Sequence, residues 1–152
     1  MSASERLKEL GIELPPVAKP AGAYVPALRN GDLVYTSGQL PFVDGKLRRT
    51  GKVGAEVSAE DAYDDARMCA INALAAIDAL VGLDNVERVV KVVGFVASDP
   101  SFTGQPKVIN GASELLGEVF GPAGEHARSA VGVAVLPADT PVEVEVVVAV
   151  AS

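Results

Sequence analysis

The chain has 152 residues, of which 49% are hydrophobic and only 5% aromatic, which suits one domain with an aliphatic core. Its 20 acidic and 13 basic residues give a net charge of −7, which argues against a general nucleic-acid binder because such proteins need a basic surface. One histidine and one cysteine exclude an internal disulfide and a zinc site built from these two residue types.

The first 20 residues are predicted to form an arm ahead of the domain. Ser2 and Glu5 have the spacing of a capping box, so a short helix is expected here, and Gly11 is suited to end it. The proline-rich segment from Leu14 to Pro20 predicts an extended linker. Since the start of the chain resembles no targeting peptide and no apolar run is long enough to span a membrane, we expect a cytoplasmic protein.

Two turn signals follow the arm. Asn30-Gly31 lies between two apolar segments and predicts a β-hairpin over residues 24–37. Asp44-Gly45 predicts a second turn shortly afterwards.

Two helices are predicted on either side of a valine-rich strand. The longer helix is expected to begin at Ser58 and to stop at Gly82, with an apolar stripe of helical period between them. The strand is expected over residues 86–98. The second helix is expected to have Pro106 in its first turn and to end at Gly121.

The last two strands are predicted over residues 127–135 and 142–150, and we expect them to pair directly as a hairpin. In that register Arg128 and Glu143 share one face but lie about six residues apart, or roughly 20 Å. The whole order of elements predicts a single α+β domain with helices on one face of a mostly antiparallel sheet.

Three segments of the sequence carry a resemblance to a known family. The first is Tyr24 followed by a Ser-Gly-Gln-x-Pro element within residues 36–41. The second is the long helix, the valine-rich strand that ends in Asp99 and a helix that carries Asn110. The third is an Arg…Leu-Pro…Val-Glu-Val-Glu pattern over 127–145. Together they resemble the RidA/YjgF family of reactive-intermediate deaminases. The resemblance implies a chorismate-mutase-like fold for a domain over 21–152, a homotrimer, and active sites between subunits.

The resemblance also implies an activity and the residues that carry it. Members of the family hydrolyse 2-imino and enamine acids such as 2-aminoacrylate to 2-keto acids and ammonia, with no metal and no organic cofactor. Arg128 matches the arginine that binds the substrate carboxylate, and Glu143 matches the glutamate that positions the attacking water. The other implied pocket positions are Tyr24, Ser37, Gly38, Asn110 and Ala130.

The chemistry of the two charged residues suits these roles. A planar guanidinium can hold a carboxylate through two parallel hydrogen bonds. A glutamate can orient a water and carry its proton to the imine nitrogen, and burial would raise its pKa and make it a better acid. Since the expected register separates Arg128 from Glu143, we expect Arg128 of one subunit to meet Glu143 of a neighbour.

The chain departs from the better-known deaminases close to Arg128, which predicts a sister subgroup. Ala130 stands where some members have cysteine, and His126 stands where a proline is frequent. Two other functions therefore stay open. One is a non-catalytic module that binds a small carboxylate or 2-keto acid, and the other is a ribonuclease or translation inhibitor, which the acidic charge disfavours.

Several of these residues also have simpler interpretations. Arg128 could be an ion-paired residue at the start of a strand, and Glu143 could belong to a solvated face. His126 is expected at most to contact residues of the site without touching the substrate itself. Cys69 is expected to be a small buried side chain.

Overall fold

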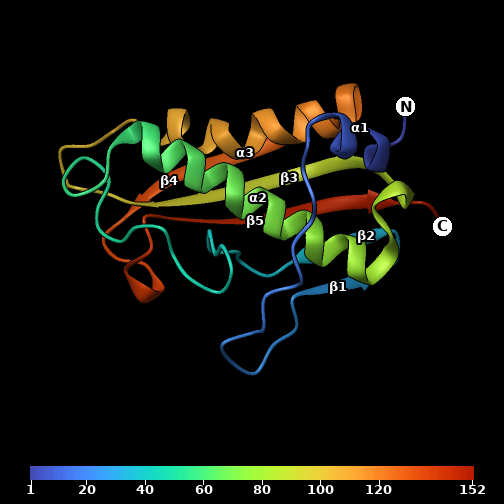
Figure 1. The fold of residues 1–152 in the computed structure, drawn as a ribbon, viewed down its shortest axis with the longest axis horizontal. Coiled ribbons are helices and arrows are strands. Elements are labelled where there is room, and N and C mark those ends of the chain that lie inside the picture. The colour runs from blue at the N-terminus through green and yellow to red at the C-terminus, as the bar shows by residue number, and fades with distance from the viewer.

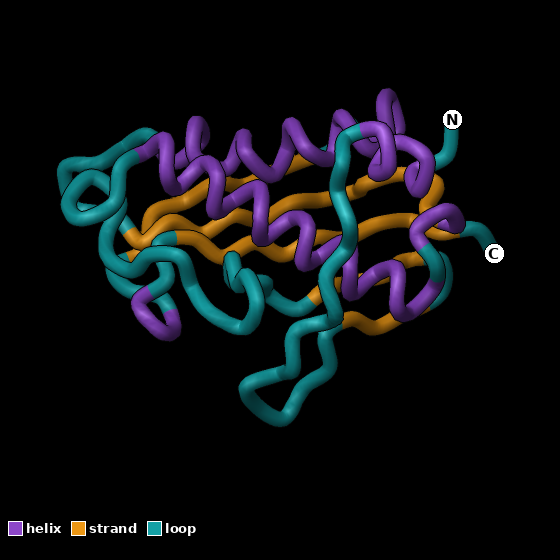
Figure 2. Tube along the Cα trace, viewed as in Figure 1, coloured by secondary structure: helices purple, strands orange, loops and turns teal.

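Two long helices lie across one face of a five-stranded sheet in the computed structural model, which describes residues 1–152 (Figure 1). The helices are α1 (Ala3–Glu9), α2 (Ala59–Val81) and α3 (Gln105–Phe120), and the strands are β1 (Ala27–Asn30), β2 (Leu33–Thr36), β3 (Val86–Ala97), β4 (Ala127–Val133) and β5 (Val142–Val150). The opposite face of the sheet carries no helix (Figure 2). The expected α+β domain with helices on one face is confirmed.

The ends of the elements follow from local chemistry. The Ser2 hydroxyl accepts from the Glu5 N–H at 3.2 Å, and the Glu5 carboxylate accepts from the Ser2 N–H, which completes the predicted capping box. The Ser58 hydroxyl accepts from the Asp61 N–H at 3.1 Å and so caps α2, and Gly82 ends that helix with a φ of 81°. Gly31 turns the β1–β2 hairpin with a φ of 63°.

The predicted hairpin between the last two strands is wrong. The strand order is β1-β2-β5-β3-β4, so β3 lies between β4 and β5. β3 pairs parallel with β4 and antiparallel with β5, and residues 134–141 cross over the end of β3. Alternation along a strand shows which side chains share a face but does not show which strand is the neighbour, and the short connection favoured the incorrect pairing.

The true strand order places Arg128 and Glu143 on opposite faces of the sheet, where the sequence had predicted a shared face. Arg128 is aligned with Val92 of β3, which is fully buried under the helices. Glu143 is aligned with Phe95, three residues further along β3. Since the side chains of Val92 and Phe95 alternate in direction, Arg128 lies on the helix-covered face and Glu143 lies on the open face.

The core fills the space between the helices and the sheet, and two close approaches set the position of α3. A Cβ on Gly94 of β3 would lie 2.4 Å from Ile109 Cδ1, so α3 packs directly on the strand at this glycine. A Cβ on Gly111 of α3 would lie 2.0 Å from the Tyr63 carbonyl oxygen, so the α2 backbone lies equally close. α3 is thereby held near β4.

The N-terminal segment packs against this body. Leu7 of α1 is buried in the core cluster, and the Ser4 hydroxyl bonds the Asp84 carboxylate at 2.8 Å. Residues 11–26 then run as coil (Figure 1), and Val17 lines a small cavity together with Ala76 of α2. None of the helices combines the length and the apolarity that a membrane span needs.

We predict that Gly111→Ala lowers the free energy of unfolding by about 1–3 kcal/mol, because its methyl group would overlap backbone atoms that cannot move aside. Gly117→Ala on the same helix is the control, since a Cβ there meets no atom within 4 Å. That change should raise stability by about 0.5–1 kcal/mol. Chemical denaturation measures both, and equal effects of the two substitutions would contradict the proposed packing of α3.

Candidate functional site

The seven residues singled out from the sequence fall into two groups, one on each side of the sheet. Glu143 lies with Tyr24 and Gly38 in a cavity of about 480 Å³, which we call the Glu143 cavity, and Ser37 directly precedes Gly38 without lining the cavity. Asn110 and Arg128 bond to each other under α3, with Ala130 two residues further along β4, and we call this group the Arg128 cluster.

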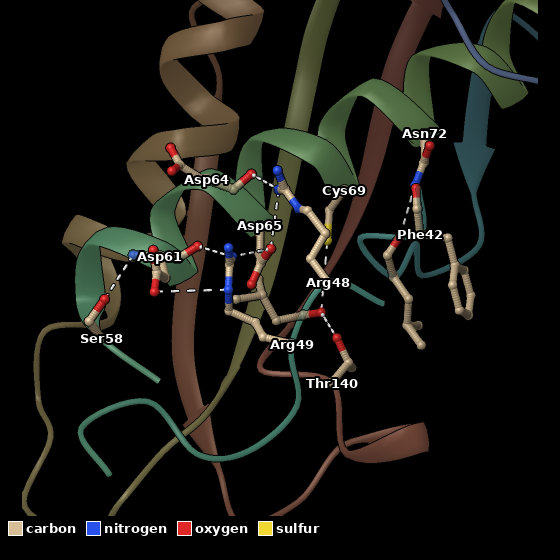
Figure 3. Close-up of polar contacts among 12 residues, drawn as sticks. Phe42, Arg48, Arg49, Ser58, Asp61, Asp64, Asp65, Cys69, Asn72 and Thr140 are labelled. Carbon is tan, nitrogen blue, oxygen red and sulfur yellow. Dashed lines mark hydrogen bonds and ion pairs between the residues drawn. The ribbon is translucent and has the colours of Figure 1, made fainter. Parts of the chain in front are cut away.

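The Glu143 cavity combines one carboxylate with mostly apolar walls. The N-terminal arm contributes residues 18–20 to its lining, and Ala21 follows them; the sequence alone did not indicate this. The remaining lining residues are Pro26, Gln39, Leu40, Phe42, Pro137 and Ala138. Asn72 of α2 supports this wall, because its side-chain amide donates to the carbonyl oxygens of Leu40 and Phe42 at 2.9 and 3.2 Å (Figure 3).

Gly38 brings the backbone directly under the Glu143 carboxylate. Gln39 exchanges two backbone hydrogen bonds with Val144, of 2.8 and 3.0 Å, which fixes this segment beside β5. A Cβ on Gly38 would lie 2.0 Å from Glu143 Oε2. With any side chain at this position the Glu143 carboxylate would have to move aside, so Gly38 permits the close approach seen in the cavity.

The surroundings of Glu143 change its ionisation. Burial is the main cause that raises the pKa of this carboxyl, and the like charge of Glu145 raises it further. Glu143 therefore keeps its proton to a higher pH than an exposed glutamate. A carboxyl of this kind can serve both as a base and as an acid in one reaction.

Tyr24 and Ser37 fix the chain beside the cavity. The Tyr24 hydroxyl accepts from the Ala21 N–H at 3.1 Å, which ties the end of the arm to the cavity wall. The Ser37 hydroxyl donates to the Val25 carbonyl, and the Ser37 N–H donates to the Pro26 carbonyl at 2.8 Å. These contacts hold the segment that carries two of the lining residues, Tyr24 and Pro26.

The Arg128 cluster holds one end of the guanidinium on α3. Nη1 donates to Asn110 Oδ1 at 2.8 Å and to Ser113 Oγ at 3.2 Å, and Nη2 donates to the Pro106 carbonyl at 3.3 Å. A guanidinium has five N–H groups, so one on Nε and one on Nη2 find no acceptor in the chain. Two N–H groups are what a bidentate carboxylate requires.

Ser113 and His126 complete this cluster, and the sequence analysis missed the first of them. His126 Nε2 lies 2.8 Å from Ser113 Oγ, and Nδ1 lies 2.6 Å from the Gly124 carbonyl oxygen. His126 thus lies behind Arg128, as expected. Asn110 and Ser113 are three residues apart on one helix, and this spacing could have identified Ser113.

The two groups do not meet within one chain. Arg128 and Glu143 are separated by roughly 10 Å along β3 and roughly 10 Å across it, and their side chains leave the sheet in opposite directions. No three His, Cys, Asp or Glu side chains gather as metal ligands would.

A third polar cluster, around Asp65 of α2, contains none of the seven residues singled out from the sequence (Figure 3). Asp65 is buried, and its Oδ1 accepts from Arg49 Nη1 at 2.7 Å and from Arg48 Nη2 at 3.2 Å, while Oδ2 has no partner. Burial raises the pKa of Asp65 although the two arginines act to lower it. The cluster holds the loop before α2 in place. Cys69 is buried one turn further on, as expected, and burial raises the pKa of its thiol well above the usual value.

A family model described as "YjgF/chorismate mutase-like, putative endoribonuclease" matches residues 4–149. The protein TCP17 of Trypanosoma cruzi is 46% identical over 144 residues, which cover 93% of this chain and 90% of that protein. The crystal structure of Atu1372 from Agrobacterium tumefaciens, a protein of unknown function, is 45% identical with a TM-score of 0.89, over 98% of this chain and 92% of that chain. The crystal structure of Escherichia coli TdcF with bound serine is 29% identical with a TM-score of 0.65, over 91% of this chain and 94% of that chain.

We predict that Arg49→Met lowers the free energy of unfolding by about 2–4 kcal/mol, because a buried carboxylate loses its shorter ion pair. Asp65→Asn in the same chain should restore part of this loss, since no charge then stays buried. Arg67→Met is the control: it breaks a partly exposed pair with Glu118, and we expect a change below about 1 kcal/mol. If urea denaturation gave the two arginine variants the same free energy of unfolding, the buried ion pair would stabilise the fold no more than the partly exposed one.

We predict that Glu145→Gln lowers the pKa of Glu143, because it removes the neighbouring like charge, and that this pKa still stays above the ordinary value, because burial is the larger cause. A carboxyl ¹³C NMR titration measures the change. Glu87→Gln near the other end of β3 is the control and should leave the Glu143 titration in place. An unchanged or higher Glu143 pKa in the Glu145→Gln variant would contradict the assignment of causes.

Proposed function

The chain belongs to the Rid/YjgF family, and we propose that it hydrolyses 2-imino and enamine acids such as 2-aminoacrylate to 2-keto acids and ammonia. One observation carries the proposal. The Arg128 cluster holds an arginine with two N–H groups that have no acceptor, and the Glu143 cavity holds a carboxyl of raised pKa. We call the Arg128 cluster and the Glu143 cavity the two half-sites. Each half-site supplies what one end of an imino acid needs.

We further propose a homotrimer in which Arg128 of one subunit faces Glu143 of a neighbour. The open face of the sheet supports this, because Leu28, Tyr35 and Val131 expose apolar side chains on the same face as Glu143. Burial of such a face in an interface is favourable. Arg128 lies on β4 at the edge of the sheet, where its free N–H groups can reach a second copy.

In the proposed reaction Arg128 binds the substrate carboxylate. Its Nε–H and one Nη2–H donate to the two carboxylate oxygens, while Asn110, Ser113 and Pro106 hold the other N–H groups. This fixes both the position and the plane of the substrate. The adjoining imine carbon is then presented to the Glu143 cavity.

Glu143 then moves the proton. As a carboxylate it accepts a proton from water while the water oxygen attacks the imine carbon and the C=N electron pair moves to nitrogen. As a carboxylic acid it returns this proton to that nitrogen, which gives a neutral carbinolamine. In a second transfer Glu143 takes the proton of the carbinolamine hydroxyl and gives it to the amine nitrogen, so that the C–N bond breaks, ammonia leaves and the C=O bond forms. Its raised pKa suits the second step, because the carboxylic acid form remains available at a higher pH. An enamine acid first takes a proton at its terminal carbon and then follows the same course.

A second candidate function is binding of a small carboxylate without turnover. The structure of TdcF with bound serine favours it, since a relative then holds a small amino acid. Ala130, in place of the cysteine of some members, removes one polar group beside Arg128. An activity on RNA, which the description of the family includes, is less favoured because the chain has a net charge of −7.

The purified protein is expected to speed ammonia release from enzymatically generated 2-aminoacrylate. Arg128→Ala should lower kcat/KM by about 100-fold or more, since a charged bidentate contact is lost. Glu143→Gln should lower kcat with little change in 2-keto acid binding. Arg67→Met on the surface of α2 should keep full activity. Saturable binding of pyruvate without any turnover would instead favour the second function.

Mixing the two inactive variants tests the shared site. Arg128→Ala and Glu143→Gln subunits, unfolded and reassembled together at equal amounts, should regain about a quarter of the wild-type activity, because that share of interfaces pairs an intact arginine with an intact glutamate. No regain, when wild-type protein recovers from the same treatment, would place both residues of a site in one chain.

A further inference from the structure

We propose that Ser113 and His126 are positioning residues for Arg128, and that they hold its guanidinium ready for a carboxylate through a chain of hydrogen bonds. The chain of bonds runs from Arg128 Nη1 through the Ser113 hydroxyl and the His126 ring to the Gly124 carbonyl. The inference rests on the proposed function only for the identity of the ligand.

With a neutral His126 ring, the two ends of this series of hydrogen bonds set the direction of every bond in it. The Gly124 carbonyl can only accept, so His126 Nδ1 carries a proton and donates at 2.6 Å. In the neutral ring Nε2 is then an acceptor, and the Ser113 hydroxyl donates to it at 2.8 Å. This leaves the lone pairs of Ser113 for Arg128, which donates at 3.2 Å. One arrangement of protons satisfies all the groups, and bonds aligned in this way strengthen one another.

The far end of the chain of bonds is attached to rigid backbone. Gly124 is buried, and a Cβ there would lie 2.4 Å from the Leu116 carbonyl oxygen of α3. The turn that holds Gly124 therefore packs directly on the helix that also carries Asn110 and Ser113. Both acceptors of Arg128 Nη1 are thus fixed relative to one helix.

The benefit of this arrangement is entropic. A free arginine side chain has many rotamers, and a ligand that fixes it loses up to about 2 kcal/mol of binding free energy. Because Nη1 is held in advance, the unoccupied N–H groups of Nε and Nη2 already point in a set direction. A carboxylate then binds without ordering the side chain first.

Four variants and one spectroscopic signature test the proposal. We expect Ser113→Ala to weaken pyruvate binding, measured by calorimetry, by about tenfold, and to raise KM by a similar factor with kcat nearly unchanged. His126→Ala should act in the same direction but by a smaller factor. Ser113→Thr keeps the hydroxyl and should bind nearly as wild type. Tyr63→Phe, which removes a hydroxyl bonded to Glu114 of α3, is the control and should bind as wild type.

NMR of the ligand-free protein tests the chain of bonds separately from the function. Nitrogen-15 shifts should show His126 protonated at Nδ1, and Ser113→Ala should shift and broaden the Arg128 Nε–H signal while Ser113→Thr keeps it. A wild-type protein that neither binds nor hydrolyses any 2-keto or imino acid would refute the proposed function alone. If Ser113→Ala left the Arg128 signal or pyruvate binding unaltered, the positioning role would be overturned. If it lowered the thermal midpoint but left binding unchanged, the hydrogen bonds would stabilise the fold only, and the positioning role would again be wrong.

Discussion

The position of β3 between β4 and β5 determines how the candidate site is built. β3 bonds a neighbour along both of its edges, parallel on the side of β4 and antiparallel on the side of β5. Through these two registers Arg128 is carried under α3 and Glu143 is carried to the open face. A slip of one residue in either pairing would move Arg128 or Glu143 to the other face of the sheet, and it would also turn the buried side chains of that strand out of the core. The same register that fixes the core therefore fixes the separation of the half-sites.

Glycines set the short distances on which both half-sites depend. At Gly111 and Gly124 the absence of a side chain lets backbone pack on backbone, and α3 comes close enough to β4 for Asn110 and Ser113 to reach Arg128. At Gly38 the same property lets the Glu143 carboxylate lie over the chain. The close packing of the backbone thus positions these polar groups at hydrogen-bond distance and leaves their side chains little freedom to move.

The sequence was sufficient for the elements but not for their neighbours. The caps at Ser58 and Gly82 predicted α2, and the valine alternation predicted β5 within its observed bounds, because these signals act within a few residues. The order of strands depends on which edges pair over long separations, and alternation says nothing of that. The resemblance named Arg128 and Glu143, yet the support of Arg128 by Ser113 and the lining of the cavity by the arm come from contacts that only the folded chain creates.

In the proposed assembly the two half-sites would influence each other electrostatically. A neighbour's guanidinium beside Glu143 would act to lower the pKa of a carboxyl that burial and Glu145 have raised. When a substrate carboxylate occupies that arginine, the two charges largely cancel, and the effect of burial on Glu143 is restored. The Glu143 carboxylate would then be a stronger base toward the attacking water once substrate is bound, and the proton that it takes is the one it later gives to the departing nitrogen. A shared site can thus couple substrate binding to proton supply, which neither half-site could achieve alone.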